Sequence, residues 1–405
     1  MKTESDIKRG QQAGPTEAPG AGARTPRWVW LDIMRGIASL WIVYYHTYST
    51  YASHKPRLNP STWPELVGHY LEQGWSPLAA LFGAGHDIFA IASMGAVGIF
   101  VIMSGYGLTR SAFSRERKGQ LRWGAWLGDR FWRLYPFFWV AHLIFAFGPF
   151  VWQPEALDYR FWISLTGVRA YPMHSIFFYA NPSWWFFWLI IQLYLIFPLC
   201  YVGIKRCGPV VFFLASLVLC LIGRYWILFI AKDGHGMITG GFFISRFAEF
   251  AFGMALALWD VRNPGQLGKM LIGLRPFFAG IFIYVCGILC YGQGLYAYIL
   301  VDPVASIGCF LLVANLASWL KDIPGLNRFL VFAGTVSLGT FLLHQPWSIT
   351  LGRALRDWSF ADHLAPAILF MLLMPWTSSL VQRGVDAVVE PLRRRLQGQK
   401  HEVHS

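Results

Sequence analysis

Charged side chains are scarce in this chain of 405 residues. Asp, Glu, Lys and Arg make up only 14% of it, whereas 55% of the residues are hydrophobic. A soluble globular domain carries about 25% charged residues, so this composition excludes an ordinary soluble protein. The 33 Phe, 20 Trp and 17 Tyr residues fit lipid-facing surfaces and the interfacial belts of membrane proteins.

Cysteine is also rare, with six residues in all. These lie mostly within or beside apolar segments and show neither a disulfide framework nor zinc-ligand spacing. We therefore expect no metal site. No internal repeat is evident in the sequence either, which weakens the interpretation of the chain as a transporter built from inverted repeats.

The first 27 residues differ in composition from the rest of the chain. They are rich in Gly, Ala, Pro and charge and have no apolar period, so we expect a disordered cytoplasmic tail at 1–27. The first long apolar run begins near residue 28, has full span length and lacks a cleavage site. We expect this run to act as its own insertion signal.

Ten apolar segments are long enough to cross a bilayer. They are 28–51, 87–109, 131–151, 184–204, 209–231, 241–259, 274–291, 303–320, 328–348 and 365–388. The sequence thus predicts an all-α, polytopic membrane protein with about ten transmembrane helices around a polar central cavity. This domain would occupy residues 28–390, followed by a basic cytoplasmic tail at 391–405.

The distribution of basic residues predicts the orientation. Loops and tails on the side of the N-terminus hold 22 Lys and Arg residues, and the opposite side holds 7. Basic residues concentrate in cytoplasmic loops, so both termini should be cytoplasmic and the protein a multi-pass component of the inner, or plasma, membrane. We attribute the net charge of +13 to this topology and to contact with anionic membrane lipids, not to nucleic-acid binding.

Two polar side chains stand out in the first predicted span, Arg35 and His46. An ionisable residue inside a span is costly unless it faces a partner or a water-filled cavity. Eleven residues of helix make about three turns, so both side chains should project from one face, about 16 Å apart along the axis. Asp32 lies three residues before Arg35 and can pair with it. The alternative is that Arg35 extends to the interface and His46 is a packing residue.

Other predicted spans also carry polar residues that are candidates for the site. Arg130 and Arg133 share a helix face at the cytoplasmic start of the third span, where they could also be ordinary positive-inside anchors. The remaining candidates are His344, near the outer end of the ninth span, and a potential ion pair of Arg246 with Glu249 in the sixth. His344 could simply cap a helix end, and the ion pair is more readily explained as structural.

Arginines near the cytoplasmic side and histidines toward the outer side suggest chemistry on a phosphorylated donor. Arginine binds phosphate in a bidentate manner, so a basic inner cluster suits a phosphorylated cytosolic ligand. Histidine titrates near neutrality and suits removal of a proton from a hydroxyl. The gap between Arg35 and His46 is comparable with the length of an extended pantetheine arm, which would let a coenzyme A thioester present its carbonyl across the bilayer.

Several segments, in this order, resemble the acyltransferase-3 family of bacterial membrane proteins. They include LDIMRGIASLWIVYYH, IFVIMSGYGLTRS, DRFWRLYPFFW, WWFFWLIIQLYLIFPL, SRFAEFAFGMALA and TVSLGTFLLHQPW. The resemblance extends from residue 28 to about residue 390. Its most specific elements are Arg and His separated by ten residues in the first span, and the Arg-x-x-Arg pair before Tyr-Pro in the third.

The resemblance implies transfer of an acyl group, usually acetyl, from cytoplasmic acyl-CoA to a hydroxyl of an exported or cell-surface carbohydrate. It implies that His46 is the essential histidine and Arg35 its partner, with Arg130 and Arg133 at the donor. Ser104 and Tyr106 match the Ser-Gly-aromatic turn after the second span. A polysaccharide synthesis or export machinery would be a further partner.

Several mechanisms and functions remain open at this point. His46 could act as general base on the acceptor hydroxyl, or it could carry the acyl group as an acyl-histidine. Arg35 would polarise the thioester oxygen or hold the donor, and Asp32 would orient Arg35. The alternatives to an enzyme of this kind are a transporter or flippase and a scaffold of a polysaccharide export system. An acyltransferase acting on lipid or protein is a further possibility.

Overall fold

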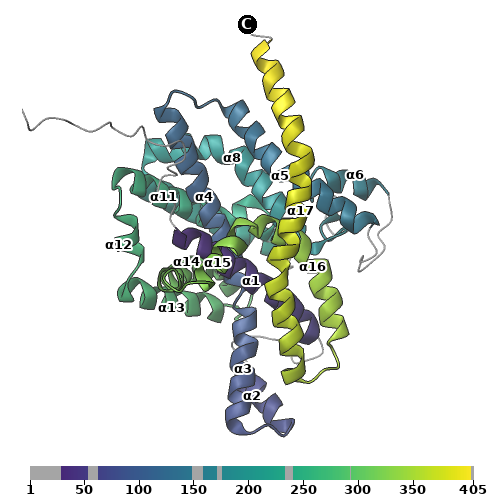
Figure 1. Ribbon diagram of the computed structural model, residues 1–405. Coiled ribbons are helices and arrows are strands. Elements are labelled where there is room, and N and C mark those ends of the chain that lie inside the picture. Colours follow the sequence, from purple (N-terminus) through teal and green to yellow (C-terminus); the bar gives the residue numbers. More distant parts are fainter. Residues whose placement is uncertain are drawn as a thin grey trace, which may run out of the picture.

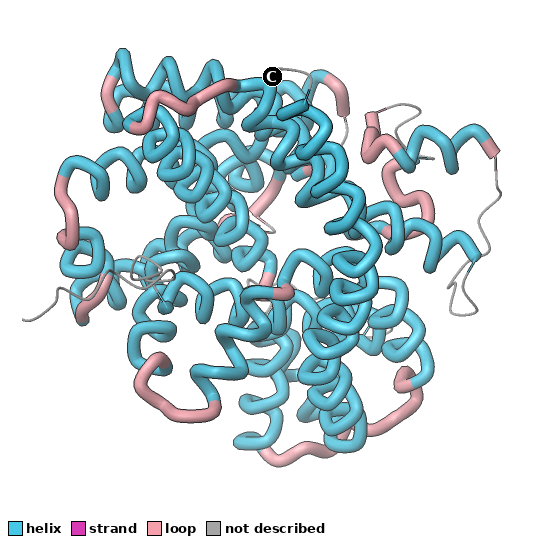
Figure 2. Tube along the Cα trace, turned by 45° about the horizontal axis from the view of Figure 1, so that its top comes forward, coloured by secondary structure: helices cyan, strands magenta, loops and turns pink. Residues whose placement is uncertain are grey.

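The computed structural model describes residues 29–52, 63–147, 158–170, 176–232, 240–291 and 293–402. Within these ranges the chain forms helices joined by turns and loops, and no strand occurs among them (Figure 2). The predicted all-α class is confirmed for this part of the chain. The predicted tail at 1–27 lies outside the described residues, and in the predicted tail at 391–405 the helical backbone is described as far as residue 402.

The helices differ widely in length. They are α1 (Val29–Tyr51), α2 (Trp63–Glu72), α3 (Pro77–Ile91), α4 (Met94–Arg117), α5 (Trp123–Phe147), α6 (Tyr159–Leu165), α8 (Trp185–Cys207), α9 (Pro209–Tyr225), α11 (Phe247–Arg262), α12 (Leu267–Leu271), α13 (Leu274–Leu289), α14 (Leu295–Leu320), α15 (Leu326–Thr335), α16 (Ser337–Ala354) and α17 (Phe360–Glu402).

Five helical segments are long and apolar enough to cross a membrane among the described residues. They are Pro77–Arg117, Pro182–Cys207, Pro209–Ile230, Leu295–Leu320 and Phe360–Pro391. Counting α15 and α16 together adds a sixth. The chain is thus an α-helical membrane protein. Each of the ten predicted segments overlaps a helix, but ten membrane crossings remain a prediction.

Two of the predicted segments differ in detail from the helices observed. The span predicted at 328–348 is broken, because α15 and α16 meet at an angle of 83°. The break lies at Val336, whose φ of −98° and ψ of 8° leave the α-helical range. The span predicted at 87–109 begins within α3, which together with α4 forms one long apolar segment.

Helix α1 lies at the centre of the bundle (Figure 1) and packs against α4, α14, α15, α16 and α17. Its closest neighbour is α15, and the contact depends on two glycines. A Cβ atom on Gly36 would lie 2.1 Å from the backbone oxygen of Leu330, and one on Gly334 would lie 2.0 Å from that of Asp32. This close approach brings the break between α15 and α16 next to the part of α1 that carries Asp32 and Arg35.

The remaining helices surround this centre. Helix α4 packs closely on α11, where Gly105 and Gly253 lie against the opposing backbone. Figure 1 shows α17 extending beyond the bundle toward the C-terminus, with α2 and α3 at the opposite end. We call the end that holds the C-terminal half of α4 the arginine end, and the end that holds the C-terminal half of α1 the histidine end.

Candidate active site

A cavity of about 470 Å³ lies between α1, α4, α5, α8 and the α15–α16 break. It brings together four of the predicted site residues, Arg35, Ser104, Arg130 and Arg133, which come from three helices. Tyr194 on α8 also contributes to its wall. The rest of its lining is largely apolar, so the cavity combines a cationic part with an apolar part.

The two arginines of α5 sit in different surroundings. Arg130 is partly buried, and its Nη2 donates a hydrogen bond of 2.8 Å to the hydroxyl of Ser111. Its guanidinium carbon also lies 4.3 Å from the centroid of the Trp126 ring, at a distance suited to a cation–π contact. Arg133 is exposed. Arg130 is therefore held in place, whereas Arg133 remains accessible to a ligand.

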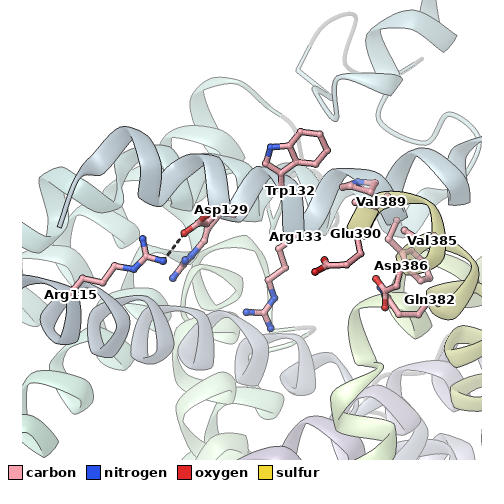
Figure 3. Close-up of a pocket in the computed structure, with 12 residues that line it drawn as sticks. Arg115, Asp129, Trp132, Arg133, Gln382, Val385, Asp386, Val389 and Glu390 are labelled. Carbon is pink, nitrogen blue, oxygen red and sulfur yellow. Dashed lines mark hydrogen bonds and ion pairs between the residues drawn. The ribbon is translucent and has the colours of Figure 1, made fainter. Parts of the chain in front are cut away.

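A second cavity, of about 330 Å³, adjoins the first at the arginine end (Figure 3). Arg130 and Arg133 line both cavities. Figure 3 shows the ion pair of Arg115 with Asp129, of 2.6 Å, on one side of Arg133 and the acidic residues of α17 on the other. The two α5 arginines thus form the wall that the two cavities have in common.

Arg35 points away from His46 along α1. Its Nη1 lies 3.4 Å from the Oδ1 of Asp32, one turn nearer the N-terminus, and the Asp32 side chain is buried. Helical side chains lean toward the N-terminus of their helix, which agrees with this placement. Because α1 is continuous from Val29 to Tyr51, the two side chains begin about 16 Å apart. Arg35 and His46 therefore cannot bind the same carbonyl group.

The two candidate histidines do come together. The ring centroids of His46 and His344 are 5.1 Å apart, and the side-chain amide of Gln345 lies 3.3 Å from Nδ1 of His46. His344 is fully buried, and its Nδ1 is 2.9 Å from the carbonyl oxygen of Phe341. Only a protonated Nδ1 can bind that oxygen, so a neutral His344 carries its lone pair on Nε2. Among the residues that the structure describes, this buried Nε2 has no hydrogen-bond partner.

A small third cavity lies between the 470 Å³ cavity and His344. Its lining includes His344 and Thr340 on α16 and Ser39 on α1. Phe100 and Phe341 line both this cavity and the 470 Å³ cavity. The polar interior predicted from the sequence is thus divided: the two cavities share a wall of aromatic rings instead of forming one open polar passage.

The prediction of a turn after the second span at Ser104, Gly105 and Tyr106 is wrong, because α4 continues through them to Arg117. The three residues make different contacts. Ser104 faces the large cavity, and Gly105 allows the close packing of α4 on α11. Tyr106 is not among the residues that line that cavity; its hydroxyl donates a hydrogen bond of 2.7 Å to Asp260 Oδ2. Asp260 also binds Arg110 at 2.6 Å. A role of Tyr106 in donor binding remains a prediction and would have to be indirect.

Arg246 and Glu249 belong to a larger buried network. They pair at 3.1 Å, and Arg246 also binds Asp302 at 2.9 Å. Asp302 in turn binds Arg224 at 2.5 Å. Two cations and two anions balance each other here, and none of the four residues lines the cavities described above. The described residues contain no cluster of three potential metal ligands.

Comparison with known proteins settles the family. The profile of an acyltransferase domain, that of the acyltransferase-3 family, matches residues 28–380. The chain belongs to the acyltransferase-3 family. It is accordingly a membrane acyltransferase, and the matched residues include helices α1 to α16 and the first part of α17. No curated protein and no solved structure gives a significant match.

Some residues of this acyltransferase site could not be predicted from the sequence. Phe100, Phe341 and Tyr194 are aromatic residues in apolar helices, and nothing distinguishes them from packing residues until the helices are assembled. Gln345 follows His344 directly, where the sequence suggested a helix end; that suggestion is wrong, because α16 continues to Ala354. Asp302, which lies outside these cavities, did carry a signal, because a carboxylate inside an apolar helix requires a buried partner.

Proposed function

We propose that this acyltransferase moves an acyl group, most simply acetyl, from cytoplasmic acyl-CoA to a hydroxyl of an exported or cell-surface carbohydrate. The observation that carries the proposal is the 470 Å³ cavity, in which Arg35, Arg130 and Arg133 converge from α1 and α5. Three arginines around one cavity suit an anionic ligand with several phosphates. Coenzyme A carries such phosphates and joins them to a long, less polar arm.

In this proposal the arginine end binds the donor. Arg130 and Arg133 hold the phosphates, and Arg133 is accessible from both the 330 Å³ and the 470 Å³ cavity. Arg35 completes the binding site and is oriented by Asp32. Since its guanidinium lies toward the N-terminus of α1, we assign it to holding the donor and not to polarising the thioester oxygen. Ser104 and Tyr194 offer hydroxyl groups along the same wall.

The histidine end would carry out the chemistry. His46 takes the proton of the acceptor hydroxyl, whose oxygen attacks the thioester carbonyl; the new C–O bond forms, the C–S bond breaks, and coenzyme A leaves as thiolate and is then protonated. The side-chain nitrogen of Gln345 lies toward Nδ1 of His46, and its Oε1 has no hydrogen-bond partner among the described residues. If the amide turns so that Oε1 accepts a hydrogen bond from a protonated Nδ1, the Nε2 lone pair of His46 is left for the proton. Transfer through an acyl-histidine remains a second route to the same products.

The orientation follows from the same assignment. Coenzyme A is a cytosolic metabolite, so the arginine end would face the cytoplasm together with both termini, in the inner membrane. The acceptor would then approach from the histidine end. Membrane lipids surround the helices, and a polysaccharide synthesis or export machinery would supply the carbohydrate.

Release of coenzyme A by the purified protein tests this function. We expect release from acetyl-CoA that depends on a glycan acceptor, together with an acylated glycan detectable by mass spectrometry. A flippase would move a substrate without covalent change, and a scaffold would leave coenzyme A intact in the purified state. Absence of both coenzyme A release and acyl transfer with every acyl donor and glycan tested would contradict the proposal.

A further inference from the structure

The small cavity beside His344 measures about 10 Å³. That volume holds about one water-sized group. It lies beyond Phe100 and Phe341 as seen from the 470 Å³ cavity, because those two rings line both. A group that enters this cavity, and so reaches His344, from the 470 Å³ cavity therefore passes these rings.

The walls of this cavity combine apolar and polar groups, as a short acyl group requires. Ile42, Val43, Phe100 and Phe341 supply apolar surface, and Ser39, Thr340 and His344 are its polar residues. The buried hydroxyl of Thr340 has no hydrogen-bond partner in the part of the chain that the structure describes. It is thus available to donate to a carbonyl oxygen, while the aliphatic side chains would surround a methyl group.

The aromatic wall is itself firmly packed. The ring of Phe341 lies 4.9 Å from that of Phe186, which in turn lies 6.2 Å from Phe100, measured between centroids. Val43 is only 1% exposed and belongs to the large hydrophobic core. Close-packed interiors resist insertion of even one extra methylene group, so this cavity cannot expand freely to accept a longer chain.

We propose that this cavity is the subsite for the terminal carbon of the acyl group, and that Phe100 and Phe341, together with Ile42 and Val43, limit the donor to a two-carbon chain. The proposal rests on the proposed function, because it requires an acyl-CoA donor. One methylene group in an apolar site changes the specificity constant about 10- to 200-fold. We expect the preference for acetyl-CoA over propionyl-CoA to fall in this range.

Substitutions at Val43 test the subsite in both directions. Val43→Ala removes two methyl groups and should raise the ratio of propionyl to acetyl transfer about tenfold, whereas Val43→Ile adds one methylene and should reduce acetyl transfer by a similar factor. Val313→Ala is the matched control, because Val313 is also 1% exposed but lies on α14, outside the cavity. Its ratio should equal that of the wild type.

The measurement is kcat/KM for acetyl-, propionyl- and butyryl-CoA, with the folded fraction of each variant determined by size exclusion. A wild-type protein that transfers butyryl and acetyl groups equally would overturn the subsite and leave the proposed function intact. The subsite would also be overturned if the Val43→Ala and Val313→Ala variants showed the same chain-length ratio. If the wild-type protein transferred no acyl group from any of the three donors, that result would instead count against the proposed function.

Discussion

His46 and His344 lie with their ring centroids 5.1 Å apart, although they belong to helices near opposite ends of the chain. The Nδ1 atoms of the two rings are held differently, His46 by the side chain of Gln345 and His344 by the backbone carbonyl of Phe341. Backbone contacts fix the tautomer of His344 firmly, whereas an amide can turn to serve either tautomer of His46. His344 thus keeps Nε2 as its lone-pair nitrogen, whereas His46 can present either ring nitrogen to a substrate.

Replacement of Arg133 tests the donor site without a folding penalty. Arg133 is exposed and lines the large cavity, so Arg133→Ala should raise the KM for the acyl-CoA donor about tenfold, with little change in kcat. The reason is the loss of a charged hydrogen bond to phosphate. Steady-state kinetics over a range of donor concentrations measure the effect.

The control for Arg133 is Arg117→Ala. Arg117 is likewise exposed, lies at the end of α4, and lines neither cavity at the arginine end. The Arg117→Ala substitution should leave the KM for the acyl-CoA donor unchanged. Equal effects of the two substitutions would mean that general surface charge, and not a defined phosphate site, governs donor affinity.

Asp302 should be critical for stability and not for chemistry. It binds both Arg224 and Arg246, and Asp302→Asn would leave two buried cations against the single carboxylate of Glu249. Breaking such a buried pair costs about 3 to 5 kcal/mol, so the detergent-solubilised variant should unfold at a clearly lower temperature.

The double variant Asp302→Asn with Arg224→Met restores the charge balance and should recover part of the lost stability. Activity per folded molecule should remain close to that of the wild type in both variants. An Asp302→Asn protein with a wild-type unfolding temperature would show that the network is not structural.

Gly36 should tolerate no side chain. A Cβ atom there would meet the backbone oxygen of Leu330 at 2.1 Å, and backbone atoms of α15 cannot move aside as a flexible side chain can. Gly36→Ala should therefore destabilise the protein by about 1 to 3 kcal/mol and weaken donor binding by displacing Arg35. Thermal unfolding and donor titration measure the two effects.

Gly384→Ala serves as the comparison for Gly36. It lies within α17, and a Cβ atom there would have no heavy atom within 4 Å. Alanine favours a helix over glycine by up to about 1 kcal/mol, so this variant should be at least as stable as the wild type. A Gly36→Ala protein of equal stability would disprove the tight contact between α1 and α15.

The helical class and the polar residues of the site were predictable because charge inside an apolar segment is a strong local signal. Arg35 and His46 share one helix, so helical spacing alone relates them. Arg130 and Arg133 are related in the same way. These relations need no knowledge of how the helices assemble.

The parts that could not be predicted depend on contacts between helices. Phe100 and Phe341 are far apart in sequence and have no feature that separates them from packing residues. The break at Val336 follows no proline, and the close packing of Gly334 on α1 beside it is visible only in the assembled bundle. The contact of Arg35 with Asp32, in contrast, was predictable from their spacing on one helix.

The most direct test of whether His46 performs the chemistry is to measure donor binding and acyl transfer together in purified His46→Ala protein. The control is His69→Ala, at a histidine of α2. We expect the dissociation constant for acetyl-CoA to remain close to that of the wild type, because the arginine end is unchanged. Transfer to the glycan should fall at least about a hundredfold, the lower range for loss of a general base or nucleophile. A His46→Ala protein that transfers acetyl groups at the wild-type rate would contradict this role.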